Sequence, residues 1–410
     1  MSFAALWESL LPVGRDGGTG GYRRFSWTPA DAECRRWFFN AAEERHLRAD
    51  TDRNGNLWAW WDPPGIVDPG AGPGAVVTGS HLDSVPDGGA FDGPLGVVTA
   101  FAAIDLLRER GVAPSRPLAV AAFCEDEGAR FGVACLGSRL LAGAIGPDQA
   151  RGLRDRDGTT FAEAMTAAGR DPAAIGPDPG LVAGIAAYVE LHIEQGRALA
   201  DVDAAIGVAE RIWPHGRWRL TFTGRADHAG TTRLGDRRDP MLACAAAILA
   251  ARGAAARQGA MATVGKVIAE PGAVNAISSS VTAWLDARAP DEAHLHSVVE
   301  RVLAQARAAA TAQGVGLDAS QESVTPAVDF DAALRDRLVA TLAAAGIPAP
   351  VLPTGAGHDA GVLAARVPAG MLFVRNPTGV SHSPAEHAEP GDCATGVTAL
   401  AAVLEDLACH

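Results

Sequence analysis

Residues 79–93, with the sequence GSHLDSVPDGGAFDG, place an imidazole and two carboxylates in a glycine-rich loop directly after an apolar run. That run, residues 75–78, is typical of a buried strand. Open α/β sheets build ligand sites where such strands end. His81 and Asp92 are therefore candidate metal ligands, and Asp83 is placed to orient the imidazole through its other ring nitrogen. Standing alone, the stretch fits a polar turn with an incidental histidine equally well.

The segments around this loop alternate between helical and strand-like patterns. Thr28 and Pro29 form a typical helix start, and Gly111 follows an apolar helix that Pro94 opens. The predicted elements are a helix over about 28–47, strands over about 56–61 and 75–79, a helix over 94–111, and strands over 117–124 and 186–194. Alternation of this kind indicates an α/β fold with a mostly parallel sheet flanked by helices.

The pattern changes over residues 212–324. Its predicted elements are a strand over 217–223, a helix over 239–255, strands over 261–269 and 280–288, a helix over 291–313 and a strand over 315–322. The order β-α-β-β-α-β is the ferredoxin-like split arrangement, which is a compact α+β unit. We therefore expect an inserted domain here, within a catalytic domain built from residues 1–211 and 325–410. Helices near 329–345 and 391–408 and a strand over 371–374 complete that outer domain.

Four further segments carry metal-binding side chains at predicted strand ends of the outer domain. They are CEDEG (124–128) with Asp126 and Glu127, ELHIEQG (190–196) with His192 and Gln195, TGAGHDAG (354–361) with His358 and Asp359, and GVSHSP (379–384) with His382. A single histidine in such a loop is more often structural. Imidazoles and carboxylates at several strand ends of one sheet together favour a metal site.

Charge and composition exclude other classes of partner. The chain has 35 basic and 48 acidic side chains, a formal charge of −13, which argues against nucleic acid or an anionic membrane as a partner. The six cysteines form no CxxC pair and are typical of free thiols in a reducing compartment. No apolar run is expected to reach the roughly 18–20 residues of a membrane span. We predict a cytoplasmic protein.

These motifs together resemble the metal-dependent amidohydrolase branch of the M20 peptidase-like family. That branch contains allantoate amidohydrolases, N-carbamoyl-L-amino-acid hydrolases and β-ureidopropionases, and the resemblance covers nearly the whole chain. It implies two divalent metal ions, Zn²⁺ or Mn²⁺, with Co²⁺ or Ni²⁺ also suited to mixed nitrogen and oxygen ligands. By resemblance, His81, Asp92 and His192 hold one ion, and Asp92, Glu127 and His382 hold the other.

The resemblance also implies a general base directly before the metal-binding glutamate. In the family this residue is Glu, whereas here it is Asp126, one methylene shorter. A displacement of about 1 Å in a catalytic group can cost about 10²-fold in rate. Because GARFG at 128–132 still matches the family, we expect the local backbone to compensate; Glu125 is the alternative base. Asp83 joins Asp126 as a catalytic residue in this interpretation.

Substrate contacts are also implied by the resemblance. The motif GRADHAGTTRLGDRRDPM lies at a dimer interface in similar proteins, and its histidine, here His228, stabilises the developing oxyanion. Gln195, Asn275, Arg288 and Gly357 are the other implied contacts. Arg288 has an independent rationale, since a guanidinium binds a carboxylate through two parallel hydrogen bonds. We expect a homodimer formed through the inserted domain, which also serves as a lid.

The expected reaction is hydrolysis of a ureido C–N bond in a small carboxylate, with release of ammonia and carbon dioxide. Allantoate ranks first as substrate because GRWRLTFTG and MLFVRNPTGVSHSPAEHAE are most similar to allantoate amidohydrolase-type members. N-carbamoyl-L-amino acids rank second, with the β-ureidopropionase reaction beside them. A metal-binding homologue of weakened catalysis, marked by Asp126, is the remote alternative.

Overall fold

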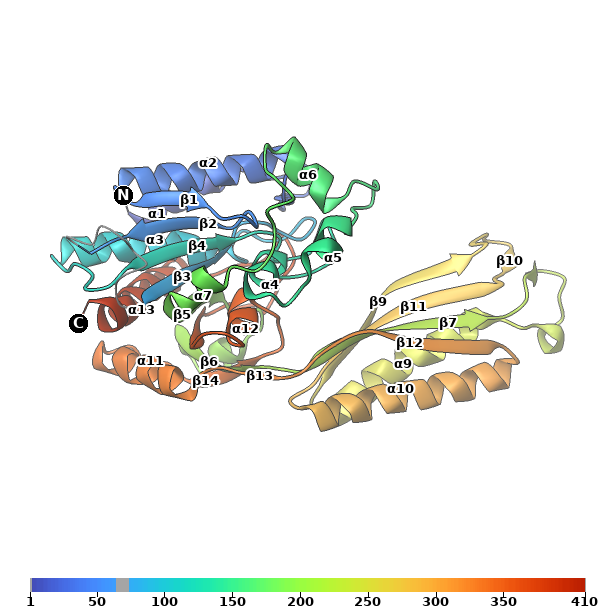
Figure 1. Cartoon of the computed structure of the whole chain (residues 1–410). Helices are drawn as coiled ribbons and strands as arrows, with labels where there is room; N and C mark the ends of the chain where they lie inside the picture. Colours follow the sequence, from blue (N-terminus) through green and yellow to red (C-terminus); the bar gives the residue numbers. More distant parts are fainter. Residues whose placement is uncertain (1, 64–73, 410) are drawn as a thin grey trace. The chain divides into compact units, whose positions relative to one another are not determined.

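The computed structural model describes residues 2–63 and 74–409 (Figure 1). It consists of two compact units. The first combines Met1–Glu210 with Asp329–His410, and the second is Arg211–Val328. The first unit is therefore built from both ends of the chain.

A nine-stranded sheet forms the centre of the first unit, in the order β1-β2-β4-β3-β5-β15-β6-β13, with β14 paired to β6. The strands are β1 (Arg48–Thr51), β2 (Leu57–Trp61), β3 (Ala75–His81), β4 (Leu118–Phe123), β5 (Ile185–Ile193), β6 (Ile206–Ile212), β13 (Val328–Asp329), β14 (Val351–Thr354) and β15 (Ala369–Val374). The four central strands β4, β3, β5 and β15 are parallel. Towards the edges, β1 pairs with β2, β2 with β4, and β6 with β15, all antiparallel. The sheet is therefore mixed, with the predicted parallel arrangement at its centre.

Helices cover both faces of this sheet. They are α1 (Phe3–Leu10), α2 (Pro29–Glu44), α3 (Pro94–Glu109), α4 (Leu136–Ala142), α5 (Pro147–Gly152), α6 (Phe161–Ala167), α7 (Pro179–Ala183), α8 (Ala198–Asp201), α11 (Ala332–Ala344), α12 (Asp359–Leu363) and α13 (Pro390–Ala408). On one face, α3 packs against α13, β3 and β5, and the fully buried Phe101 lies in this core. Helix α12 packs on β5 and β15 and against α4. As predicted, Thr28 caps α2 by accepting the N–H of Asp31.

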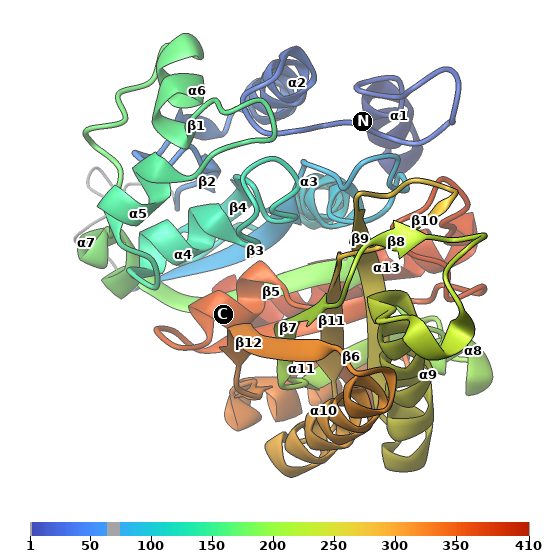
Figure 2. The same ribbon diagram turned by 90° about the vertical axis from the view of Figure 1, so that its right-hand side faces the viewer.

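The second unit is a four-stranded antiparallel sheet with two long helices. Its elements are β7 (His215–Thr223), β8 (Asp227–His228), η2 (Leu234–Asp236), α9 (Pro240–Gln258), β9 (Met261–Glu270), β10 (Ala276–Ile277), β11 (Ser280–Arg288), α10 (Glu292–Gln313) and β12 (Gly316–Thr325). The strand order is β12-β7-β11-β9, and β8 pairs separately with β10. Helices α9 and α10 lie side by side (Figure 2). The predicted β-α-β-β-α-β order is present, and alternate residues of β11 are buried under the helices.

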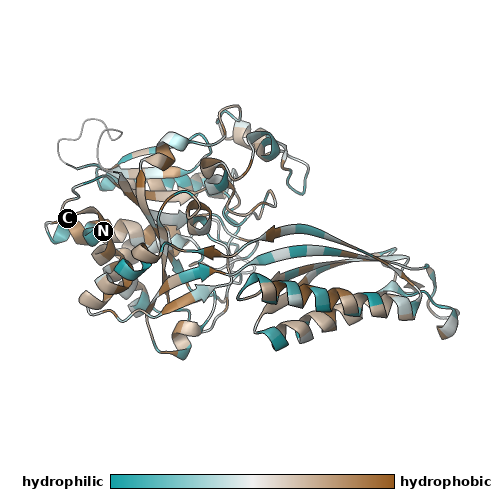
Figure 3. Ribbon diagram, turned by 60° about the horizontal axis from the view of Figure 1, so that its bottom comes forward, coloured by the Kyte–Doolittle hydropathy of each residue, from teal (hydrophilic) through white to brown (hydrophobic). Residues whose placement is uncertain are grey.

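Helix α9 corrects the expectation that no segment reaches the length of a membrane span. It has 19 residues, and an 18-residue window of it has a mean hydropathy of 1.2. Alanines and larger apolar residues both contribute to this value, and several alanines, including Ala247 and Ala251, are buried in the core of the second unit. The ribbon of this unit carries hydrophilic and hydrophobic bands in turn along its helices (Figure 3). The buried alanines face the core of the unit, whereas the larger side chains of Leu242 and Leu249 are exposed. Length and composition alone make one such helix weak evidence for a membrane span.

Candidate metal centre and active site

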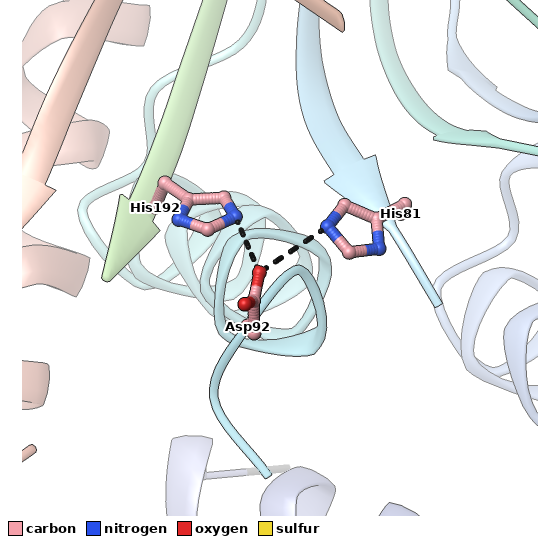
Figure 4. A group of neighbouring side chains, drawn as sticks. All are labelled: His81, Asp92 and His192. Atoms are coloured by element: carbon pink, nitrogen blue, oxygen red, sulfur yellow. Dashed lines mark ion pairs between the residues drawn. The ribbon is translucent and has the colours of Figure 1, made fainter. Parts of the chain in front are cut away.

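The carboxyl ends of the parallel strands bring the first group of ligand side chains together. His81 is the last residue of β3, His192 lies near the end of β5, and Asp92 comes two residues before α3. Asp92 Oδ1 lies 3.2 Å from His192 Nε2 and 3.6 Å from His81 Nε2 (Figure 4). All three side chains are buried. This geometry suits one cation between two imidazoles and a carboxylate.

A second group uses the other oxygen of the same aspartate. Asp92 Oδ2 lies 3.3 Å from His382 Nε2, which lies 3.6 Å from Glu127 Oε2. Within each group, one donor atom from every residue lies within 4.8 Å of the others. Asp92 therefore stands between two ligand groups, with one oxygen facing each.

The local backbone allows these side chains to approach closely. Gly93 has a φ of 86°, and a Cβ at this position would lie 2.4 Å from the His81 ring. His382 itself has a φ of 54°, in the left-handed region that non-glycine residues rarely adopt. Such conformations cost about 1–3 kcal/mol and persist where the surrounding structure enforces them, often at functional sites.

The second ring nitrogens of the two buried histidines are held by backbone carbonyls. His81 Nδ1 lies 3.1 Å from the carbonyl oxygen of Asp83, and His192 Nδ1 lies 2.8 Å from that of Ile193. Because a carbonyl can only accept, each Nδ1 carries a proton and each Nε2 is left for a metal. The Asp83 carboxylate, 3.5 Å from His81 Nδ1, accepts the backbone N–H groups of Asp126 and Glu127 at 3.1 Å each. Asp83 thus links the β3 loop to the loop after β4.

The electrostatics of the cluster fit bound cations. Burial alone would lower the pKa of His192, but the nearby Asp92 carboxylate raises it to about 9. Contact with Asp92 likewise raises the pKa of His382 to about 9, against the effect of burial. Burial, followed by the charge of Asp92, raises the pKa of Glu127 to about 8. Without a metal ion, these raised pKa values mean that His192, His382 and Glu127 bind protons readily, and a bound cation would replace those protons.

Unsatisfied polar atoms give a second test of fit. Among the side chains of residues 2–63 and 74–409, His192 Nε2, Glu127 Oε1 and Asp126 Oδ1 are buried and make no hydrogen bond. Such atoms are rare in native proteins and call for a partner such as an ion or water. Two of these atoms belong to ligand candidates, His192 and Glu127. The three imidazoles and two carboxylates of the two groups offer the nitrogen and oxygen donors that suit divalent cations.

Asp126 lies beside the first ligand group. Its Oδ2 is 3.4 Å from His81 Nε2, and burial raises its pKa, which favours proton acceptance. Glu125 is oriented differently, because its Oε1 accepts the backbone N–H groups of Arg130 and Phe131. The Glu125 carboxylate therefore holds the turn that follows it, whereas the Asp126 carboxylate lies beside the ligand His81.

One residue that the sequence analysis did not assign, Glu190, also lines the centre. Glu190 lies within 4.8 Å of His192 and His358, and its two oxygens accept from the Ser80 hydroxyl at 2.7 Å and the Ala360 N–H at 2.9 Å. Its place in ELHIEQG, two residues before His192 on the same strand face, was the available signal.

The loops after β5 and β14 hold two predicted substrate contacts. Gln195 Nε2 donates to Asp92 Oδ2 at 2.8 Å and lies 3.2 Å from His382 Nε2. Gly357 directly precedes His358, which stands at the start of α12. Both loops therefore lie at the edge of the sheet that carries the ligands.

The remaining predicted contacts belong to the second unit. His228 lies in β8 opposite Ala276 of β10, and the N–H of Ala229 donates to the carbonyl of Asn275 at 2.9 Å. His228 and Asn275 are therefore neighbours. Arg288 ends β11, where its Nε and Nη2 donate to the two oxygens of Asp286 at 2.9 and 3.3 Å.

Strand register places these contacts at opposite ends of one sheet. Ser280 of β11 pairs with Thr223, next to the β8 and β10 loops, whereas Arg288 pairs with His215 at the start of β7. The nine residues of β11 span about 27 Å at 3.4 Å per residue. The structure therefore brings His228 and Asn275 together, but it does not bring them to Arg288 within one copy of the chain.

Comparison with known proteins identifies the family of the chain. The model of the peptidase family M20/M25/M40 matches residues 77–406. The chain belongs to this family. It is 36% identical over 404 residues to the N-carbamoyl-L-amino acid amidohydrolase of Geobacillus stearothermophilus, covering 96% of each chain. It is 34% identical to the allantoate amidohydrolase of Escherichia coli, covering 95% of this chain and 93% of the relative.

Other matches extend this picture. The ureidoglycolate hydrolase of Oryza sativa is 34% identical, covering 94% of this chain and 80% of the relative. A solved amidase of the hydantoinase/carbamoylase family from Burkholderia vietnamiensis has a TM-score of 0.88 and 29% identity, covering 100% of this chain and 98% of its own. The family and these full-length relatives make the chain an amidohydrolase of non-peptide C–N bonds.

Proposed function

We propose that this amidohydrolase cleaves the ureido C–N bond of a small carboxylate at a centre of two divalent metal ions. The convergence of His81, Asp92, Glu127, His192 and His382, with Asp92 shared between two ligand groups, is the observation that supports this proposal. When bound, a pair of divalent ions would polarise the carbonyl and lower the pKa of water. Zn²⁺ and Mn²⁺ are the ions we propose.

The chain's own residues would move the proton and hold the substrate. Asp126, at the edge of the first ligand group, accepts a proton from the attacking water as its oxygen bonds to the ureido carbon. As the C–N bond breaks, Asp126 returns that proton to the departing nitrogen. Arg288 binds the substrate carboxylate, and Asn275 offers a donor and an acceptor to the ureido group.

Allantoate is the substrate we place first, with N-carbamoyl-L-amino acids as the second candidate. Relatives named for each of these activities match nearly the whole chain at 34% and 36% identity. Both substrates carry a carboxylate near a ureido nitrogen, so the same Arg288 contact serves either one. Ureidoglycolate belongs in the same test because a relative is named for its hydrolysis.

We further propose that the active unit is a homodimer in which a second copy supplies His228 and Asn275. About 27 Å of strand separates these residues from Arg288 within the second unit, so one small substrate could not contact both in a single copy. A two-fold symmetric pair would bring each chain's His228 to the other chain's metal ligands. The second unit would then serve as the dimerisation domain and lid.

Ammonia release tests the function directly. Protein stripped with a chelator is incubated with allantoate, an N-carbamoyl-L-amino acid or ureidoglycolate, each with and without Zn²⁺, Mn²⁺ or Co²⁺. We expect metal-dependent turnover of at least one ureido carboxylate. Absence of turnover with all three substrates and all three ions would overturn the proposal.

A further inference from the structure

Glu386 is a buried carboxylate that touches the metal centre without belonging to either ligand group. It follows His382 by four residues and is 5% exposed. Its Oε1 accepts the backbone N–H groups of Phe91 and Asp92, at 3.0 and 2.9 Å. One oxygen therefore fixes both peptide groups next to the shared ligand, across 294 residues of sequence.

The other oxygen reaches the same aspartate through a serine. Ser381 Oγ lies 3.3 Å from Glu386 Oε2 and 3.4 Å from Asp92 Oδ2. Ser381 also directly precedes His382, the ligand of the second group. Glu386 therefore reaches Asp92 in two ways. One of its oxygens accepts the backbone N–H of Asp92, and the other is linked through Ser381 to the Asp92 carboxylate.

The loop that contains Gly89 packs closely against the Glu386 side chain. A Cβ on Gly89 would lie 2.4 Å from Glu386 Cβ and from its Oε1, so any side chain at position 89 would displace the carboxylate. The close approach of these two loops thus depends on a glycine at this position.

We propose that Glu386 is a positioning residue that sets Asp92 between the two ligand groups, so that both metal ions can be held at once. This inference deepens the proposed function, because it rests on Asp92 as the shared ligand. Partners of this kind orient ligands through hydrogen bonds, and their loss typically weakens metal affinity about 10- to 100-fold.

The test measures metal binding separately from activity. Chelator-stripped protein is titrated with Co²⁺ in the presence of a competing indicator, for the wild type and for Glu386→Ala, Glu386→Gln and Gly89→Ala. We expect Glu386→Ala and Gly89→Ala to lower the affinity for at least one of the two Co²⁺ ions about 10- to 100-fold. Gln keeps an acceptor for both N–H groups and a donor towards Ser381, so Glu386→Gln should stay close to the wild type.

A matched control is Glu389→Gln, because Glu389 lies on the same loop, is exposed, and pairs with His387 rather than with a ligand of either group. It should bind Co²⁺ as the wild type does. If Glu386→Ala does not fold, Ser381→Ala tests the same connection and should weaken binding in the same direction. Two ions bound at wild-type affinity by Glu386→Ala and Gly89→Ala would overturn the inference, as would a Gln variant as weak as Ala. If no ureido substrate is cleaved, the proposed function fails while this metal readout still stands.

Discussion

The division of substrate contacts between the two ends of the second unit predicts that active sites are shared between copies of the chain. Two variants test this: Glu127→Gln, which removes a proposed metal ligand, and His228→Ala, which removes the proposed oxyanion donor. Each homodimer should lose activity, by about 10²- to 10³-fold for His228→Ala, as for other oxyanion donors. A heterodimer with one chain of each kind combines one intact metal centre with one intact His228 from its partner.

The size of the recovery follows from two-fold symmetry. In the heterodimer, the Glu127→Gln chain donates an intact His228 to its partner's intact metal centre, and the other site carries both defects. The heterodimer should therefore recover about half of the wild-type rate per dimer. If His228 served its own chain, each site would carry one defect and no recovery would occur.

The assay is ammonia release by heterodimers made by co-expressing the two variants with different affinity tags and purifying through both. Sedimentation of the purified protein checks that it is a dimer. A doubly tagged heterodimer no more active than either variant would refute the shared site, and so would a wild-type enzyme that is fully active as a monomer.

Three further predictions concern the centre itself. Asp126→Asn should reduce turnover at least about 10²-fold, while elemental analysis should still find two bound ions. Glu125→Gln should keep its activity if it folds. The reverse pattern would assign the base to Glu125. Arg288→Lys should raise KM for carboxylate substrates at least about tenfold, because the bidentate contact is lost, with metal content unchanged; an unchanged KM would place the carboxylate elsewhere. Because His192 and His382 have pKa values raised to about 9 without metal, protons compete with the ions, so apparent Zn²⁺ affinity should rise from about pH 6 to about pH 9. Calorimetry in buffers of different ionisation enthalpy measures the protons released, and an affinity independent of pH would contradict this assignment.

The sequence allowed prediction of those features that depend on local pattern. Apolar runs followed by polar loops identified β3, β4, β5 and β15, and their parallel pairing explains why His81 and His192 meet. The strands β1, β6, β13 and β14 were not predicted. β1 has only four residues, none of them fully buried, so it lacks a strong apolar pattern.

The features that the sequence did not reveal depend on tertiary contacts. Nothing local distinguishes Glu386 from an exposed glutamate, and its role becomes visible only when the Asp92 loop packs against it. The Asp83 carboxylate lies 3.5 Å from His81 Nδ1, beside the ring nitrogen that it was expected to orient, and it also accepts the amide N–H groups of Asp126 and Glu127, which was not expected. A long-range pairing of this kind has no signature in residue spacing.

The most direct measurement is the anomalous diffraction of crystals of the Zn²⁺-loaded protein, recorded on both sides of the zinc absorption edge. The account predicts two peaks in each chain, one contacted by His81 and His192 and the other by Glu127 and His382, with one oxygen of Asp92 on each. A single peak, or peaks held by other side chains, would contradict the two-metal centre on which the proposed hydrolysis depends.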